Sequence, residues 1–315
     1  MDLAEKYRPG TLDEVINQDP VVKSLKSILG RGLESMPHAF LFCGHHGCGK
    51  TTLGFILKNE MKCSDMNFEY YNTSNTRGID TIRDLDKLCR FRPITKENEN
   101  PIKLYLLDEC HELTRNAQNA LLALLENPPE HAYFILCTTE PGQLLDTIRS
   151  RCHTYTLQPF NRVRLVALLK GICDKEGITF PPGILKKIAD SSENSARKAL
   201  KILDQIIDIP GSDAEVEEAI QNASVDHKEV IDICRIMLEK QYTNWPDLCS
   251  MLRSIDAKPE EIRRSILGYL ASVAMNSKKY PAKLITLMTL FSESVMYSGL
   301  GGLLAQIGLA FSAED

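Results

Sequence analysis

Short apolar runs alternate with amphipathic stretches over the first half of the chain. The apolar runs predict strands at residues 39–43, 103–107 and 133–137, and two less apolar segments, 68–72 and 154–157, also read as strands. Apolar positions that recur every three or four residues predict a helix at 21–29, before the first strand, and helices at 53–61 and 80–91 between the strands. A further helix, capped by Thr114 or Asn116, is predicted to run through Leu125. Strands that alternate with helices indicate a mostly parallel α/β sheet, in which ligands bind at the carboxyl ends of the strands.

The pattern changes near residue 161, and no strand pattern is visible after Leu157. Helical periodicity continues at residues 165–175, 183–189, 195–207, 230–240, 245–256, 259–276 and 282–297. Pro181-Pro182 and Pro210-Gly211 interrupt it. We therefore expect three domains: an α/β domain over residues 1–160, a small helical domain over 161–225 and a second helical domain over 226–315.

Length and composition narrow the class of protein. The chain has 315 residues, with 43% hydrophobic and 25% charged, which is typical of a globular protein of two or three domains. No apolar run approaches the ~20 residues of a membrane span, and the first residues do not form a signal peptide. We expect a cytoplasmic protein with no membrane partner. The net charge of −5 argues against a globally basic surface but allows a local basic strip.

The cysteines do not indicate a metal site or a disulfide framework. Ten are present, none in a C-x-x-C pair, and several lie inside apolar runs. Such thiols are typical of buried positions in a reducing compartment. We expect no zinc.

The strongest chemical signal lies between the first strand and the following helix. The segment reads Gly44-His45-His46-Gly47-Cys48-Gly49-Lys50-Thr51-Thr52. Glycines allow the backbone to curl so that successive N–H groups face phosphate oxygens, and the start of a helix favours an anion. Lys50 would contact the β- and γ-phosphates, and the Thr51 hydroxyl would bind Mg²⁺. The alternative is a glycine turn with a chance Lys-Thr, but the flanking strand and helix favour the phosphate loop.

A second signal is the acidic pair that ends the strand at residues 103–107. In a nucleotidase, Asp108 would hold the metal and Glu109 would orient and deprotonate the attacking water. The alternative is a strand that simply exits into an acidic turn. A phosphate loop about sixty residues upstream favours the nucleotidase interpretation.

The sequence motifs alone do not decide the roles of three further side chains, Thr139, Arg151 and Arg197. Thr139 could hold the attacking water or the γ-phosphate if its strand lies between the strand of the phosphate loop and the strand of the acidic pair. Otherwise its hydroxyl only satisfies a hydrogen bond at the end of its strand. Arg151 could pair with an acid of its own subunit or face outward. Arg197 opens a later helix, and a solvated or ion-paired side chain is the plain alternative for both arginines.

Nucleic-acid contact is suggested by one helix face. Arg83, Lys87 and Arg90 recur at i, i+4 and i+7, so they share a face. Together with Arg77, Arg92 and Arg115 they could follow phosphates inside a ring. The alternative is a solvated face interleaved with the acids Asp80, Asp84 and Asp86.

Several motifs, taken in order, match a known family. They are the phosphate loop and Asp108-Glu109 with Tyr7-Arg8-Pro9, Thr11-Leu12-Asp13-Glu14-Val15, Asn119-Ala120-Leu121-Leu122, Glu126-Asn127-Pro128-Pro129, Thr138-Thr139-Glu140-Pro141, Ser150-Arg151-Cys152 and Ser195-Ala196-Arg197. Through them, residues 6–207 resemble the AAA+ ATPase subunits of sliding-clamp loaders, both the bacterial gamma/tau type and the replication factor C small subunits. Ser150-Arg151-Cys152 is the most specific element.

The resemblance implies a fold and roles for residues. The fold would be an α/β P-loop NTPase (AAA+) domain with a parallel sheet, a small helical lid domain and an all-helical collar that oligomerises. ATP and Mg²⁺ would bind at the phosphate loop, and Thr139 and Arg197 would be the two sensors. Arg151 would be the arginine finger that acts in trans on the neighbouring subunit. The adenine and ribose would pack on Lys6, Tyr7, Arg8, Val15 and Ile16.

The implied function is a DNA-stimulated ATPase in a replisome-associated clamp loader. Its partners would be a sliding clamp, primer–template DNA and companion subunits, identical or mixed, in a pentameric ring or spiral. The rivals are another AAA+ assembly ATPase, such as a helicase loader, and a scaffold that does not hydrolyse ATP. The chain departs from the family at His45-His46 and Cys48, and it retains only Cys63 where the gamma/tau type has a zinc module.

Overall fold

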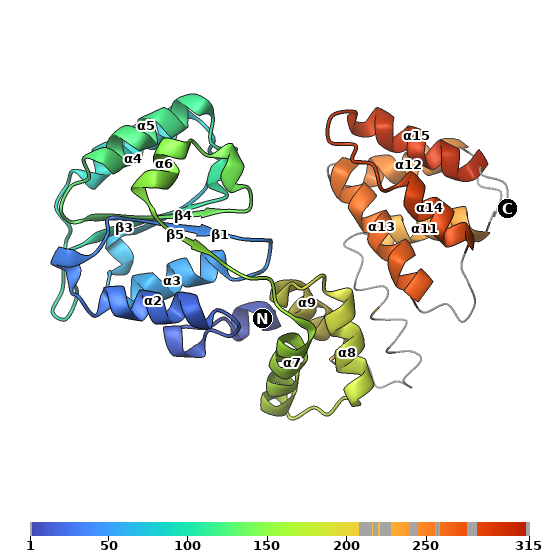
Figure 1. Ribbon diagram of the computed structural model, residues 1–315, viewed down its shortest axis with the longest axis horizontal. Coiled ribbons are helices and arrows are strands. Elements are labelled where there is room, and N and C mark those ends of the chain that lie inside the picture. The colour runs from blue at the N-terminus through green and yellow to red at the C-terminus, as the bar shows by residue number, and fades with distance from the viewer. Residues whose placement is uncertain are drawn as a thin grey trace. The chain divides into compact units, whose positions relative to one another are not determined.

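The computed structural model describes residues 2–207, 228–239, 245–255, 257, 259–275 and 282–312, with the single positions 216 and 220. The chain divides into two compact units (Figure 1). The first contains Met1–Gly177 and Glu193–Leu200, and the second contains Ile178–Ser192 and Lys201–Asp315. The predicted boundary at 225/226 lies outside the described residues, and the one at 160/161 stays a prediction.

A five-stranded parallel sheet forms the centre of the first unit, in the order β2-β3-β4-β1-β5. Its strands are β1 (Ala39–Cys43), β2 (Phe68–Asn72), β3 (Lys103–Asp108), β4 (Ala132–Thr138) and β5 (His153–Thr156). All five predicted strands are confirmed. The register pairs Asn72 with Asp108 and Cys43 with Thr138, so the strands end together at one edge. This edge brings the predicted motifs together.

Helices cover both faces of the sheet (Figure 1). α2 (Asp19–Leu29) and α3 (Lys50–Glu60) cover one face, and α4 (Ile79–Cys89), α5 (Arg115–Glu126) and α6 (Asp146–Arg151) cover the other. The unit also contains α1 (Leu3–Lys6), α7 (Arg162–Glu176) and the start of α9 (Ala196–Ile206). Single 3₁₀ turns are η1 (Leu12–Glu14), η2 (Leu33–Ser35), η3 (Asp65–Asn67), η4 (Cys110–Glu112) and η5 (Pro141–Gln143).

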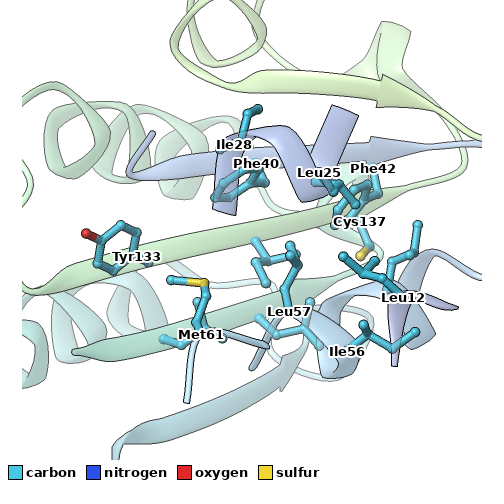
Figure 2. Packing of buried hydrophobic residues seen from close by; sticks show 14 of the residues in the cluster. Leu12, Leu25, Ile28, Phe40, Phe42, Ile56, Leu57, Met61, Tyr133 and Cys137 are labelled. Carbon is cyan, nitrogen blue, oxygen red and sulfur yellow. The ribbon is translucent and has the colours of Figure 1, made fainter. Parts of the chain in front are cut away.

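The alternation of strand side chains divides the core into two layers. Phe40 and Phe42 of β1 belong to the layer that contains Leu25 of α2 and Leu57 of α3 (Figure 2). Leu41 belongs to the opposite layer, with side chains of α4, α5 and α6. Successive strand residues point to opposite faces, and because both faces are covered, β1 and β4 are buried along their whole length. β2 and β5 lie at the two edges of the sheet, include polar residues and are partly exposed. Most of the cysteines are buried free thiols, as predicted.

The second unit is helical. It contains α8 (Pro182–Ser191), α11 (Lys228–Glu239), α12 (Trp245–Ser254), α13 (Pro259–Met275), α14 (Ala282–Leu290) and α15 (Gly299–Ser312). A single apolar cluster joins α11 to α15, with Ile266, Phe291 and Leu303 fully buried. Within the described ranges, no strand follows β5, and no helix has the length and apolar character that crossing a membrane requires.

The predicted helix over residues 282–297 is confirmed as far as Leu290 and is wrong beyond it. α14 ends at Leu290, and a turn leads to a separate helix, α15. A residue of another helix, Glu260 of α13, holds this turn. Its carboxylate accepts hydrogen bonds from the backbone N–H of Val295 (2.9 Å) and from the Ser294 hydroxyl (3.0 Å). A tertiary contact therefore ends the helix where the local pattern allowed it to continue.

Candidate nucleotide site

The glycine-rich segment forms a tight loop between β1 and α3. Gly47 and Gly49 have φ angles of 71° and 104°, which side chains rarely adopt. A Cβ atom on Gly47 would lie 1.9 Å from the Ser195 Oγ, because the start of α9 approaches the loop closely. The first N–H groups of α3 have no partner within the helix and lie beside this loop, as an anion site requires.

Lys50 is held at the loop by its own backbone. Its Nζ donates hydrogen bonds to the carbonyl oxygens of Gly44 (2.8 Å) and His45 (3.1 Å), and the residue is only 5% exposed. The ammonium therefore lies fixed against the curled backbone, where phosphate oxygens would replace the carbonyl partners.

Asp108 and Thr51 meet across the sheet edge. The Thr51 hydroxyl donates to Asp108 Oδ2 over 2.7 Å, and the Tyr70 hydroxyl donates to the same oxygen over 3.3 Å. Burial, with the Asp108 charge as a further cause, raises the pKa of Tyr70 to about 12. Tyr70 therefore stays a hydrogen-bond donor, and the site presents hydroxyl and carboxylate oxygens, the donor types that Mg²⁺ prefers.

Glu109 adopts a left-handed conformation, with φ at 53°. The Thr73 hydroxyl donates its one hydrogen to the carbonyl oxygen of Glu109 (2.7 Å) or shares it with that of Asp108 (3.0 Å), and this contact holds the turn. At the other end of the side chain, the Thr139 hydroxyl lies 3.5 Å from Glu109 Oε2, a long hydrogen bond. The strand β4, which leads to Thr139, lies between β3 and β1. Thr139 therefore lies between the acidic pair and the phosphate loop, as its predicted role requires.

Two imidazoles flank the Glu109 carboxylate. The Nδ1 of His46 lies 3.8 Å from Oε1, and the Nδ1 of His111 lies 3.6 Å from Oε2. His111 also shares a 3.1 Å hydrogen bond with the Thr138 hydroxyl. The sequence motifs did not single out His111 as a site residue, and its place two positions after Glu109 was the available signal.

A cavity of about 630 Å³ extends from the phosphate loop to the N-terminal segment and α7. The predicted residues that line it are Lys6, Tyr7, Arg8, Val15, Ile16, His46, Gly47, Cys48, Gly49, Lys50, Thr51, Thr52, Asp108, Glu109 and Arg197. Gly44, His45 and Thr139 instead line a neighbouring cavity of about 500 Å³. One continuous cavity thus joins polar phosphate-loop atoms to an apolar end.

The sequence reasoning missed part of this lining. Leu168, Ile172 and Lys175 of α7 face the cavity, with Gln18 and Phe160. Their spacing of four and three residues places the α7 residues on one helix face, which was the available signal. Glu176 was not predicted either. Its carboxylate accepts hydrogen bonds from Lys6 and Tyr7.

Arg151 lies outside both cavities. It ends α6, its side chain is half exposed, and its Nη2 donates to Glu126 Oε1 over 2.9 Å. Arg151 does not line the nucleotide cavity of its own chain. Arg197 differs, because the start of α9 places it in the cavity wall.

The basic residues of α4 are exposed and each has an acidic neighbour. Arg83, Lys87 and Arg90 pair with Asp80 (3.2 Å), Asp84 (2.9 Å) and Asp86 (2.8 Å). Arg77 precedes α4 and pairs with Glu112 at 3.0 Å, and Arg115 is the first residue of α5, which packs beside α4. These exposed pairs are weak, so the cations can exchange partners.

The order of the sheet, the loop after β1 and the acids after β3 define a P-loop NTPase domain of the AAA+ class. The RuvB Holliday junction branch migration motor of Thermotoga maritima has a similar structure, with a TM-score of 0.58 over 87% of this chain and 93% of that chain. The sequence identity is 19%, so this likeness shows the fold alone.

Sequence comparison shows the family. The chain is 30% identical over 313 residues to DNA polymerase III subunit gamma of Buchnera aphidicola subsp. Baizongia pistaciae, covering 88% of this chain and 82% of that protein. It is 36% identical over 204 residues to the replication factor C small subunit of Staphylothermus marinus, covering 64% and 60%. A family model described as DNA polymerase III, delta subunit, matches residues 66–161. The chain therefore belongs to the AAA+ clamp-loader subunit family.

The match to longer relatives is partial. The chain is 31% identical over 230 residues to DNA polymerase III subunit gamma/tau of Mycobacterium tuberculosis, and the match covers 66% of this chain. It covers 39% of that protein, so the chain spans about two fifths of the length of the gamma/tau relatives.

Proposed function

We propose that this chain is an ATPase subunit of a sliding-clamp loader. It binds ATP at a subunit interface, opens a sliding clamp and loads it onto primer–template DNA, and ATP hydrolysis releases the clamp. The observation that carries this proposal is the placement of Lys50, Thr51, Asp108 and Glu109 at one end of a nucleotide-sized cavity.

The residues present fit ATP with Mg²⁺. A volume of about 630 Å³ lies within the range of small-molecule sites, and the hydroxyl of Thr51 and the carboxylate of Asp108 are 2.7 Å apart. Thr51 and Asp108 would hold the metal, which would supply positive charge to neutralise the phosphate oxygens. Tyr7, Val15 and Ile16 would contact the base and ribose at the far end.

Each functional residue of the chain has its own role in ATP hydrolysis. Lys50 exchanges its two carbonyl partners for phosphate oxygens. Glu109 orients the attacking water and takes its proton. Thr139, whose hydroxyl lies 3.5 Å from Glu109 Oε2, acts as the first sensor and holds the attacking water or the γ-phosphate. Arg197 contacts the γ-phosphate from the start of α9. These roles require only the placements already described.

Arg151 supplies its charge to the neighbouring subunit. Because this side chain is half exposed and does not line its own cavity, it can act on the ATP of an adjacent protomer after leaving Glu126. An arginine finger is worth ~10³–10⁵ in rate, so hydrolysis would depend on assembly. We propose a pentameric ring or spiral of identical or mixed subunits.

DNA would be bound by the face of α4 and the start of α5. Arg77, Arg83, Lys87, Arg90 and Arg115 would exchange weak acidic partners or water for phosphates. A DNA-stimulated ATPase at the replisome, in the cytoplasm, follows from this proposal. We also propose that the chain holds no zinc, because it retains only Cys63 where the gamma/tau type has a zinc module. A scaffold that does not hydrolyse ATP is disfavoured because Asp108, Glu109 and Lys50 are all in place. A clamp pull-down would distinguish a clamp loader from a helicase loader.

The proposal is tested by ATP turnover of the purified chain with the clamp, companion subunits and primed DNA of its own source. We expect Lys50→Ala to lose ATP binding. Glu109→Gln should keep ATP binding and lose hydrolysis by at least about 10²-fold, as expected for loss of a general base. Full turnover by Glu109→Gln, or failure of the wild-type chain to bind ATP, would contradict the proposal.

A further inference from the structure

Glu176 joins the two chain segments that form the apolar end of the cavity. It is the last residue of α7, and its Oε1 accepts hydrogen bonds from Lys6 Nζ and from the Tyr7 hydroxyl, both over 2.6 Å. The Tyr7 contact spans 169 positions of sequence. A single carboxylate oxygen therefore ties the N-terminal segment to α7.

The Tyr7 ring is held by more than this one bond. The Nζ of Lys6 lies 5.5 Å from the ring centroid, and the Nζ of Lys175 lies 5.4 Å from it. Both distances are within the range of cation–π attraction. Tyr7 and Lys175 line the cavity together with Ile172, so the contact orients side chains of the cavity wall itself.

The protonation states support the contact at neutral pH. The hydrogen bond from Lys6 is the main cause that lowers the pKa of Glu176, with Tyr7 next. The hydrogen bond to Glu176 is likewise the main cause that raises the pKa of Lys6 and of Tyr7. Glu176 stays ionised and both partners keep their protons.

We propose that Glu176 is a positioning residue for the nucleotide: it fixes Tyr7 at the base end of the cavity before ATP binds. The inference rests on the proposed function, because it takes ATP as the ligand. Freed from Glu176, the Tyr7 side chain and the N-terminal segment would have to be ordered during binding. Ordering one side chain weakens affinity by roughly three- to tenfold.

The test compares ATP with inorganic tripolyphosphate, which lacks the base and ribose, as ligands in calorimetric titrations with Mg²⁺. We expect Glu176→Ala to raise the Kd for ATP roughly three- to tenfold and to leave the Kd for tripolyphosphate unchanged. Tyr7→Phe should have the same effect. The double variant should be no worse than Glu176→Ala alone, because both single variants remove the same hydrogen bond between Tyr7 and Glu176. Glu176→Gln should restore part of the affinity.

Asp65→Ala is the matched control. Asp65 also pairs with a lysine, Lys58, which lowers its pKa, but it does not line the cavity. Its Kd values should stay at the wild-type level. Equal weakening of both ligands by Glu176→Ala, or no change in ATP affinity, would overturn the inference. If the wild-type chain bound neither ligand, the proposed function itself would fail and this inference with it.

Discussion

The Thr51 hydroxyl donates a 2.7 Å hydrogen bond to Asp108 Oδ2, although 57 positions separate the two residues in sequence. Thr51 lies in the first turn of α3, after β1, and Asp108 ends β3, with β4 between the two strands. The sheet order therefore brings one oxygen donor from each motif into contact. This pairing is the structural basis for a magnesium site.

Removing the Asp108 charge should impair metal use more than nucleotide affinity. Asp108→Asn keeps the shape and an oxygen acceptor for Thr51 but loses the negative charge. We expect turnover to fall at least about 10²-fold, since an electrostatic contribution to the transition state is lost. A Mg²⁺ titration of ATP hydrolysis measures this, with Asp65→Asn as control. An unchanged magnesium requirement would show that Asp108 does not hold the metal.

Replacing Arg151 should separate binding from turnover. Arg151→Ala should keep ATP affinity, because the side chain does not line its own cavity, and should lower stimulated turnover by ~10³-fold or more. Arg149→Ala is the matched control: Arg149 lies on the same helix, α6, and pairs with Asp146. In mixed assemblies the loss should appear in the site beside the altered subunit. A loss in the altered subunit's own site would assign Arg151 a role in cis.

Charge reversal on α4 should affect only the DNA-stimulated rate. Arg83→Glu with Arg90→Glu adds two repulsive groups to the proposed phosphate path and should weaken primed-template binding by at least tenfold at low salt. Basal hydrolysis should stay unchanged. Lys23→Glu with Arg31→Glu, an equal charge change at exposed positions in and just beyond α2, should affect neither rate. Equal loss of basal and stimulated turnover would mean that the α4 residues support the fold.

The second unit should lose stability in acid through Glu260. Its carboxylate binds Arg263 through two hydrogen bonds, of 2.7 Å and 3.0 Å, and the Arg263 contact is the main cause that lowers the pKa of Glu260 from 4.5 to about 2. Because the pKa of Glu260 is lower in the folded state, its ionised carboxylate stabilises the fold fully above about pH 4.5. This stabilisation is lost as the pH falls toward 2 and the carboxylate becomes protonated.

Glu260→Gln should therefore cost about 1–3 kcal/mol at pH 7 and almost nothing near pH 2. The single tryptophan, Trp245, lies in α12 and reports unfolding of this unit by fluorescence in urea. Glu261→Gln, on the next residue of α13, provides the control. A cost that does not change between pH 7 and pH 3 would contradict the assigned pKa direction.

Much of the first unit could be predicted because its signals are local. Three of the strands, β1, β3 and β4, are short apolar runs, and the phosphate loop and acidic pair are contiguous motifs whose meeting follows from a parallel sheet. The sites that were missed depend on distant contacts. Glu176 reads as an ordinary charged residue at a helix end until α7 is placed beside Tyr7.

The C-terminal error has the same origin. Residues 282–297 read as one helix because nothing in the local pattern ends it, yet Arg263 donates to the Phe291 carbonyl and Glu260 binds the turn that follows. α15 was missed because it is rich in glycine and apolar residues, so it lacks the polar face that marks an amphipathic helix. Helix ends set by tertiary contacts cannot be read from periodicity.

Turnover per protomer, measured from dilute monomer to full assembly with clamp and primed DNA, tests the account most directly. The account predicts a rate that stays near zero for the monomer and rises with the assembled fraction, and an Arg151→Ala protein whose rate does not rise at any concentration. A lone monomer that hydrolyses ATP at the full rate, whether or not clamp and DNA are added, would contradict it.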